Sequence, residues 1–327
     1  MVSSGSDLPL HEDLRAVTEA ELEEQLELVA ASAISPLAGI FGPASMTWRI
    51  DREAIIFLAA GRALLLQLAH PWIAAAIAEH SRAPAEPIVR FHRTFSVVFT
   101  LVFGTIDQAF AAARSLHQRH SRVTGFLPQT AGPFKAGSRY CANHISALRW
   151  VYASLGESAL MAHEIVFGGL SAADRARHYS ESQLFAGMLG IPRSAVPGGY
   201  LGLANYTQAM LNSDVLTVSA AARRLADQIF SGSGSWLRAP ASYQALTAGM
   251  LPDRLRQDFG LAYGEAERRA SERMVKRVRR LYLVAPRRLR YVGPYYEASQ
   301  RLAGRARPDL GTRLSNRLWI GRPSLAS

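Results

Sequence analysis

Residues 61–81 read GRALLLQLAHPWIAAAIAEHS and decide the fold class, because they hold two apolar helix patterns on either side of His70-Pro71. Proline is favoured in the first turn of a helix, so His70 falls at the junction of two helices. The wider apolar stretch 54–79 is interrupted by charged, amide and proline side chains, and no unbroken apolar run approaches the ~20 residues of a membrane span. We therefore expect a buried helix pair in an all-α protein that is soluble or peripheral to a membrane.

Capping residues followed by glycine predict further helices along the chain. These helices run from Thr105, with Gln108 completing a capping box, to about Ser121; from Asn143 to Phe167, before Gly168-Gly169; and from Ser171, with Asp174, to near Gly190 and Pro192. Strand patterns are scarce. We predict a single globular helical bundle over residues 45–285, preceded by an acidic N-terminal extension (1–44) and followed by an irregular basic C-terminal arm (286–327).

The composition excludes several protein classes. The 327 residues are 49% hydrophobic and only 19% charged, which excludes intrinsic disorder and supports a large core. Cys141 is the single cysteine, so disulfide staples and cysteine-based zinc sites are excluded. The opening MVSSGSDLPLHEDL has neither a basic start nor an apolar core, so we expect no secretory signal and a cytoplasmic protein.

The net charge of +11 is concentrated near the C-terminus, where 18 Arg and Lys residues against 6 acidic residues follow from position 254 onward. Such a basic segment can be a solvated or interface-forming face, or it can contact anionic membranes or nucleic acid. No zinc finger, RNP aromatics or basic heptads are present, so we expect no nucleic-acid partner. Peripheral membrane contact and a homodimer contact through the arm after Arg287 remain open.

Two histidines lie within an apolar helical stripe. At 100° per residue, His117 and His120 share one side of the helix at 105–121 with its apolar residues. One interpretation is that they are hydrogen-bonded core histidines or that this end of the stripe is solvated. The other is that one of them binds a metal or haem iron, because a neutral imidazole on a rigid helix is a common axial ligand.

The preceding helix, about 88–103, begins with polar groups and continues as an apolar wall. Arg90 and Thr94 are neighbours at i,i+4 spacing, and Val97 and Leu101 continue the same stripe. A guanidinium and a hydroxyl at the head of an apolar wall suit a pocket for an anion, a propionate or dioxygen. Alternatively, Arg90 and Arg93 are solvated at a helix start near the surface.

The stretch 61–81 holds two further polar candidates. His70 can cap a helix, pack in the core or act as a ligand. Arg62 lies in so apolar a helix that it needs a partner, since an unpaired buried charge is costly. Glu157, Glu164 or a haem propionate would serve. The sequence lacks a Walker A loop, a dinucleotide-binding glycine motif, an H-E-x-x-H zinc motif and a G-x-S-x-G elbow.

Residues 61–81, RFHRT at 90–94, FGT at 103–105 and H-x-x-V-x-G at 120–125 together resemble the oxygenase family of rubber oxygenase (latex-clearing protein) and the fungal MpaB oxygenase. The likeness covers about 45–255. It implies an all-helical haem b protein that uses dioxygen to cleave isoprenoid double bonds. By motif, it implies His120 as the iron ligand, Arg90 and Thr94 on the opposite side, and Arg93 as the basic residue before Thr94.

The chain departs from the family pattern at two positions, with Thr124 where a basic residue is frequent and Tyr152 where a histidine is frequent. The nearest upstream candidate for the family's catalytic carboxylate is Glu79. We therefore expect a haem b-dependent oxygenase acting with dioxygen on a small apolar, unsaturated or isoprenoid-like substrate. The residues assigned to this function are Arg90, Thr94 and Glu79 for catalysis, His120 for iron, and Arg93, His70, Arg62 and His117 for contacts to the cofactor. The alternatives are a haem carrier or sensor on the same fold, and a cofactor-free helical protein that binds a membrane or a partner.

Overall fold

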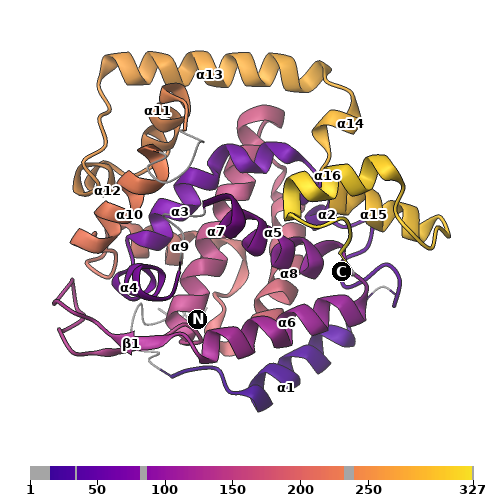
Figure 1. Cartoon of the computed structure of the whole chain (residues 1–327), viewed down its shortest axis with the longest axis horizontal. Coiled ribbons are helices and arrows are strands. Elements are labelled where there is room, and N and C mark those ends of the chain that lie inside the picture. The colour runs from indigo at the N-terminus through magenta and orange to yellow at the C-terminus, as the bar shows by residue number, and fades with distance from the viewer. Residues whose placement is uncertain (1–14, 34, 82–86, 232–238, 326–327) are drawn as a thin grey trace, which may run out of the picture.

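A computed structural model describes residues 15–33, 35–81, 87–231 and 239–325 and confirms the all-α fold (Figure 1). In chain order the elements are α1 (Glu19–Ala30), α2 (Met46–Asp51), the 3-10 helix η1 (Ala54–Ala59), α3 (Ala60–Leu68), α4 (Pro71–His80), α5 (Pro87–Phe103), α6 (Ile106–Ser121), β1 (Thr124–Phe126), β2 (Arg139–Cys141), α7 (Ile145–Phe167), α8 (Ala172–Met188), η2 (Arg193–Ala195), α9 (Gly199–Asn212), α10 (Ala220–Ser231), α11 (Ala241–Gly249), α12 (Asp253–Asp258), α13 (Glu265–Val284), α14 (Arg287–Arg290), α15 (Gly293–Leu302) and α16 (Leu310–Ile320). The antiparallel β1–β2 hairpin was not predicted from the sequence.

Helix α7 lies at the centre of the molecule, where it packs against η1, α3, α8, α9 and α13 (Figure 1). Its N-terminal turns are buried on every side, as expected of a helix that is apolar around most of its surface. The fully buried Trp150 donates its indole N–H to the carbonyl of Leu66, 2.8 Å away in α3. This bond satisfies the indole and fixes the contact between α3 and α7.

The stretch 61–81 forms the predicted helix pair, with Pro71 in the first turn of α4. The η1–α3 segment and α4 bend by 100° at their junction. Among the described residues no single helix is long and apolar enough to cross a membrane, and by length and composition this bent pair is the one candidate. Most of its apolar side chains are buried in the core.

Most of the predicted helix ends are confirmed. Thr105 forms the capping box with Gln108 at the start of α6, and Ser171 caps α8. Helix α7 ends at Gly168, whose φ of +90° favours glycine. The cap assigned to Asn143 is wrong, because its amide instead donates to the His117 carbonyl at 3.1 Å and α7 begins one residue later without a side-chain cap.

The prediction that residues 286–327 are irregular is wrong, because α14, α15 and α16 lie in this segment and the last two pack against α5. The buried carboxylate of Glu297 holds them together. It accepts hydrogen bonds from the Asn316 amide at 2.6 Å, the Ser324 hydroxyl at 2.7 Å and the backbone N–H of Leu325 at 3.0 Å. Helices of this length are marginal alone, so tertiary contacts stabilise them.

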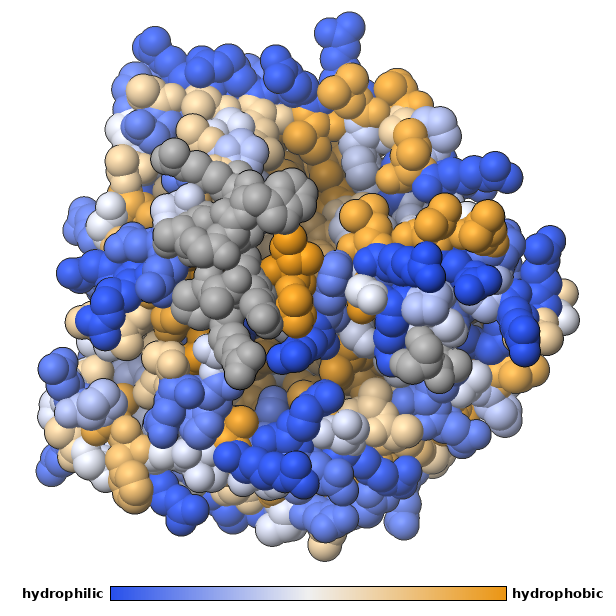
Figure 2. Space-filling view, in the orientation of Figure 1, coloured by the Kyte–Doolittle hydropathy of each residue, from blue (hydrophilic) through white to orange (hydrophobic). Residues whose placement is uncertain are grey.

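The surface of the C-terminal segment combines apolar and basic side chains. Leu310, Leu314 and Leu318 follow one face of α16 and are more than half exposed, and Arg313 and Arg317 are exposed between them. Figure 2 shows apolar side chains gathered over the end of α13, over α14 and over α16, with charged residues around them. The membrane or dimer contact expected of this segment stays a prediction.

Candidate functional site

The predicted site residues lie on a helical hairpin. Helices α5 and α6 are joined by Gly104 and Thr105 alone and pack against each other. Arg90 and Thr94, near the start of α5, and His120, near the end of α6, therefore belong to the two ends farthest from the connection (Figure 1). Among the contacts of the described residues, none joins His120 directly to Arg90 or Thr94.

His120 is half-buried in the last turn of α6, and its Nδ1 atom is buried without a hydrogen-bond partner among the described residues. Burial, with the nearby charges of Arg119 and His117, lowers the pKa of His120 to about 4, although a hydrogen bond with Asn143 opposes the shift. The imidazole is therefore neutral at physiological pH and has a nitrogen lone pair to offer.

His117, one turn earlier, is placed differently. Its Nε2 atom lies 3.0 Å from the carbonyl oxygen of Val17, so this imidazole anchors the segment before α1. Both histidines lie on α6, as predicted. They differ in their contacts, because His117 has a backbone carbonyl as partner and the Nδ1 atom of His120 has none among the described residues.

The polar residues at the start of α5 are accessible. Arg90 is half-buried and donates to the Ser81 hydroxyl at 3.0 Å, and burial lowers the pKa of its guanidinium. Arg93 and Thr94 are exposed. A guanidinium and a hydroxyl one helical turn apart thus have room to accept a ligand.

The two candidates in the 61–81 stretch are both packed within the protein. The guanidinium of Arg62 donates to Glu157 at 3.0 Å, to the Ser158 hydroxyl at 2.7 Å and to the carbonyl of Met250 at 3.0 Å. Glu157 is therefore the partner found among those left open by the sequence. The ion pair between Arg62 and Glu157 joins α3 to α7, and the bond to Met250 joins α3 to the residue that directly follows α11.

His70 packs among aromatic rings, with Phe134 at 5.2 Å and Trp72 at 6.1 Å between ring centroids. Burial and the neighbouring His144 lower its pKa to about 3. It occupies the N-cap position of α4 without a side-chain capping bond, so packing is the role that its contacts support.

Glu79 lies near the end of α4 and is exposed. Its carboxylate accepts a hydrogen bond from the Tyr140 hydroxyl of β2, which together with burial raises the pKa of that tyrosine. Glu79 thus contacts the β hairpin, and it lines neither of the two cavities described next.

A largely apolar cavity of about 90 Å³ opens between α2, η1, α3, α5, α7 and α8. Phe95 and Val98 of α5 line it, whereas Val97 and Leu101, which were predicted to continue the stripe of Thr94, are not among its lining residues. Phe57 forms another part of the wall. Its ring stacks on Trp319 of α16 at 4.7 Å and meets the edge of Phe95 at 4.6 Å.

A second, more polar cavity of about 520 Å³ adjoins the first between α7, α8 and α9. The two share four lining residues, namely Tyr152, Gly156, His178 and Ser182. Glu164, Arg175 and Tyr200 belong to the second cavity, and Arg175 donates to Tyr200 at 2.8 Å and forms an ion pair with Glu164. The shared residues therefore lie between an apolar and a polar compartment.

Sequence reasoning missed Asp51 and His178, which both line the apolar cavity. Burial and the nearby charge of Glu181 raise the pKa of Asp51 to about 7, whereas burial lowers the pKa of His178. The signal that could have found Asp51 is a carboxylate directly after Trp48 and Ile50 in a short apolar segment.

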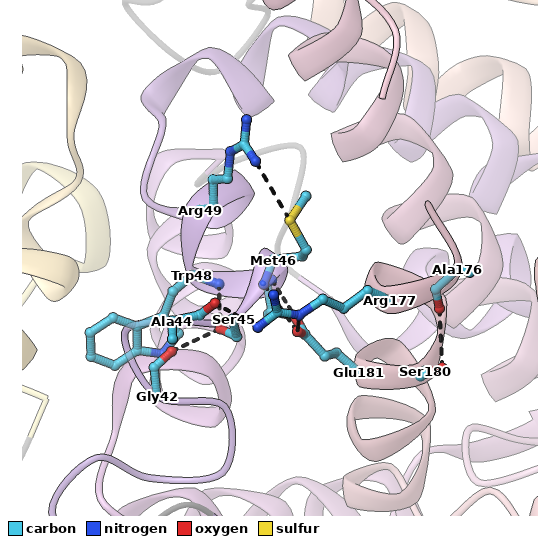
Figure 3. A network of polar contacts seen from close by, with 11 residues as sticks. Gly42, Ala44, Ser45, Met46, Trp48, Arg49, Ala176, Arg177, Ser180 and Glu181 are labelled. Carbon is cyan, nitrogen blue, oxygen red and sulfur yellow. Dashed lines mark hydrogen bonds and ion pairs between the residues drawn. The ribbon is translucent and has the colours of Figure 1, made fainter. Parts of the chain in front are cut away.

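Glu181 fixes the helix that carries Asp51 (Figure 3). Its carboxylate accepts from the backbone N–H groups of Met46 and Thr47, at 3.0 and 2.7 Å, and from the Thr47 hydroxyl at 2.8 Å. Arg177 donates to the same carboxylate and to the carbonyl of Ala44. A negative group at a helix start satisfies otherwise unpaired N–H donors, so α8 holds α2 at the cavity.

A comparison with protein families matches residues 47–280 to the catalytic domain described as ER-bound oxygenase mpaB/B'/rubber oxygenase. The chain belongs to this oxygenase family. No curated protein and no solved structure matches it. The oxygenase domain contains both cavities and every predicted site residue, whereas α14, α15 and α16 lie beyond it. Among the described residues no three His, Cys, Asp or Glu side chains gather to hold a metal ion.

Proposed function

We propose that this chain is a haem b-dependent oxygenase that acts with dioxygen on a small apolar molecule, unsaturated or isoprenoid-like. The observation that carries the proposal is His120, a neutral imidazole with an unpartnered buried nitrogen, within an oxygenase domain. A haem needs only one or two protein ligands because the porphyrin supplies four nitrogens. An imidazole with an unpartnered nitrogen on a rigid helix fits that requirement.

The other candidate side chains fit a haem less directly than His120 does. His117 is engaged by a backbone carbonyl and Arg62 by Glu157. His70 packs among aromatic rings and its Nδ1 is unpartnered as well, so it is the family motif that makes His120 the preferred ligand. When bound, haem b would supply the one-electron chemistry that dioxygen requires. We assign Arg90 to stabilising negative charge that develops on oxygen or on a polar substrate group, because its guanidinium carries a fixed positive charge.

Thr94 has an accessible hydroxyl and we assign it as a hydrogen-bond donor beside Arg90. Phe95 and Val98 supply the apolar wall on the next turns of α5, where a hydrocarbon can bury its surface and exclude water. In this assignment, Arg90 and Thr94 at the start of α5 supply the polar contacts, and the apolar cavity takes up the hydrocarbon.

The test of the ligand compares two histidines one turn apart. The purified protein should show a Soret band and near-stoichiometric haem b in a pyridine haemochrome assay. His120→Ala should lose the haem, whereas the matched control His117→Ala should keep it, because His117 is bonded to the N-terminal segment. Stoichiometric haem in purified His120→Ala would contradict the assignment.

The test of the activity uses Arg90→Ala with oxygen-uptake measurements on isoprenoid alkenes. This variant should retain haem and lose turnover, because the residue carries charge for the reaction rather than a bond to iron. A haem spectrum in the unmodified protein without oxygen uptake on any alkene would instead identify a carrier or sensor.

A further inference from the structure

Three helices contribute polar side chains to the lining of the apolar cavity, and on two of them the polar residues are i,i+4 pairs, which places each pair on one helix face. Helix α2 contributes Thr47 and Asp51, and α8 contributes His178 and Ser182. Helix α7 supplies Tyr152 on the facing side. The other described residues of the lining are apolar or glycine, apart from Ser158, and none of them is an arginine or a lysine.

The hydrogen bonds inside this polar group leave two members without partners. Tyr152 and Ser182 pair through their hydroxyls at 2.8 Å, and Thr47 donates to Glu181. Among the described residues, no hydrogen bond or ion pair reaches the side chain of Asp51 or of His178. Both side chains are half-buried at the cavity wall, so a bound molecule that pairs with both can replace their contacts with water.

The charge of the cavity narrows the ligand class. The raised pKa of Asp51, about 7, leaves a large fraction of this carboxyl protonated at neutral pH, and the lowered pKa of His178 keeps that imidazole neutral. The charge of Glu181 is already matched by Arg177 and by the start of α2. A neutral head group therefore fits best, since an anion would meet a carboxyl in a cavity whose described lining holds no arginine or lysine, and an ammonium group would have to be desolvated.

We propose that this cavity binds an apolar molecule carrying one neutral hydroxyl group, which Asp51 and His178 hydrogen-bond while its hydrocarbon part lies along Phe95 and Val98. A hydroxyl both donates and accepts, so one group can satisfy a carboxyl and an imidazole together. The inference rests on the proposed function only in calling this molecule the substrate, because binding itself needs neither haem nor dioxygen.

The test measures binding of three probes with the same eight-carbon chain, 1-octanol, octanoate and octylamine, by isothermal titration calorimetry on the purified full chain at neutral pH. Octanol should bind most tightly. Asp51→Leu should weaken octanol binding about tenfold, the usual effect of losing one hydrogen bond to a buried group. Asp51→Asn, which keeps hydrogen-bonding capacity, should weaken it less.

Two further variants control the experiment. Asp107→Asn changes an exposed carboxylate at the start of α6 and should leave octanol binding unchanged. Ala159→Phe fills the cavity from α7 and should abolish binding. Circular dichroism of each variant confirms that it is folded.

Three results would overturn the inference: equal octanol affinity in Asp51→Leu, tighter binding of octanoate or octylamine than of octanol, or undiminished octanol binding in Ala159→Phe. These outcomes are separate from the failure of the proposed function. A colourless protein that binds octanol through Asp51 removes the haem oxygenase and leaves the alcohol site. A haem protein that turns over alkenes but does not bind octanol removes the alcohol site and leaves the haem oxygenase.

Discussion

The ion pair between Glu53 and Arg290 fastens α14 to the oxygenase domain. The Glu53 side chain is 4% exposed and accepts from Arg290 at 2.7 and 3.2 Å and from the Tyr282 hydroxyl at 2.9 Å. The guanidinium also lies over the rings of Phe167 and Tyr291, at 5.2 and 5.8 Å. Arg290 therefore contributes charge, hydrogen bonds and packing at one place.

Arg290→Met keeps the apolar stem and removes both charged hydrogen bonds, which leaves Glu53 buried with Tyr282 as its remaining partner. Removing one member of a buried ion pair costs about 3–5 kcal/mol. Because Arg290 itself is 16% exposed, we expect the lower end, a loss of about 3 kcal/mol in the free energy of unfolding. Adding Glu53→Leu should recover most of this loss, since no unpaired charge stays buried.

Urea unfolding followed by far-ultraviolet circular dichroism measures both effects. Arg288→Met, at an exposed neighbouring position of α14, is the control and should change stability by no more than about 0.5 kcal/mol. A loss below about 1 kcal/mol in Arg290→Met, or a double variant as unstable as the single one, would refute the reasoning.

Three other predictions concern the core and the hairpin helix. Arg62→Met should destabilise the protein by about 3 kcal/mol in urea unfolding, because all three hydrogen bonds are lost. Glu157→Gln leaves the bonds to Ser158 and Met250 in place and keeps an oxygen acceptor for the third, so it should cost about 1 kcal/mol; equal losses would contradict the role of the buried guanidinium. His70 has a folded-state pKa of about 3 against 6.5 ordinarily, so the unfolded chain binds the extra proton and stability falls as the pH drops below 6.5. His70 should contribute about 2 kcal/mol of the stability lost at pH 5 relative to pH 8, so the loss in His70→Gln should be smaller by that amount, and a loss as large as in the unmodified protein would assign it to the other buried histidines. Thr105→Ala removes the capping bond of α6 and should lower stability by about 1 kcal/mol, while an unchanged urea midpoint would show that the cap is not needed.

Local signals predicted the helices because their causes are local. The capping box at Thr105, the Ser171 cap and the glycine after Phe167 each act within one turn of the chain, and each is found where the sequence placed it. Asn143 carries an equally good capping side chain, yet a carbonyl of α6 binds its amide. A competing partner 26 residues away is invisible to a local pattern.

The C-terminal helices and the position of Asp51 in the cavity could not be predicted, because both depend on contacts between residues far apart in the sequence. Prolines, glycines and arginines around 286–296 resemble a loop, and the helices there depend on the buried Glu297. Asp51 becomes a cavity residue only because Glu181, 130 positions later, holds α2 in place. The roles assigned to Arg90, Thr94 and His120 came from family motifs and stay predictions that the experiments above test.

The stacking of Trp319 on Phe57 makes the end of the chain part of the cavity's outer support. Trp319 stands beyond residues 47–280, which the family shares, so ligand preference is not encoded by the shared domain alone. Two relatives with identical catalytic segments and different tails would enclose differently shaped spaces. Exchange of the C-terminal segment, rather than substitution near His120, is then a route to a differently shaped cavity, and a protein trimmed to the shared domain lacks part of that cavity's support.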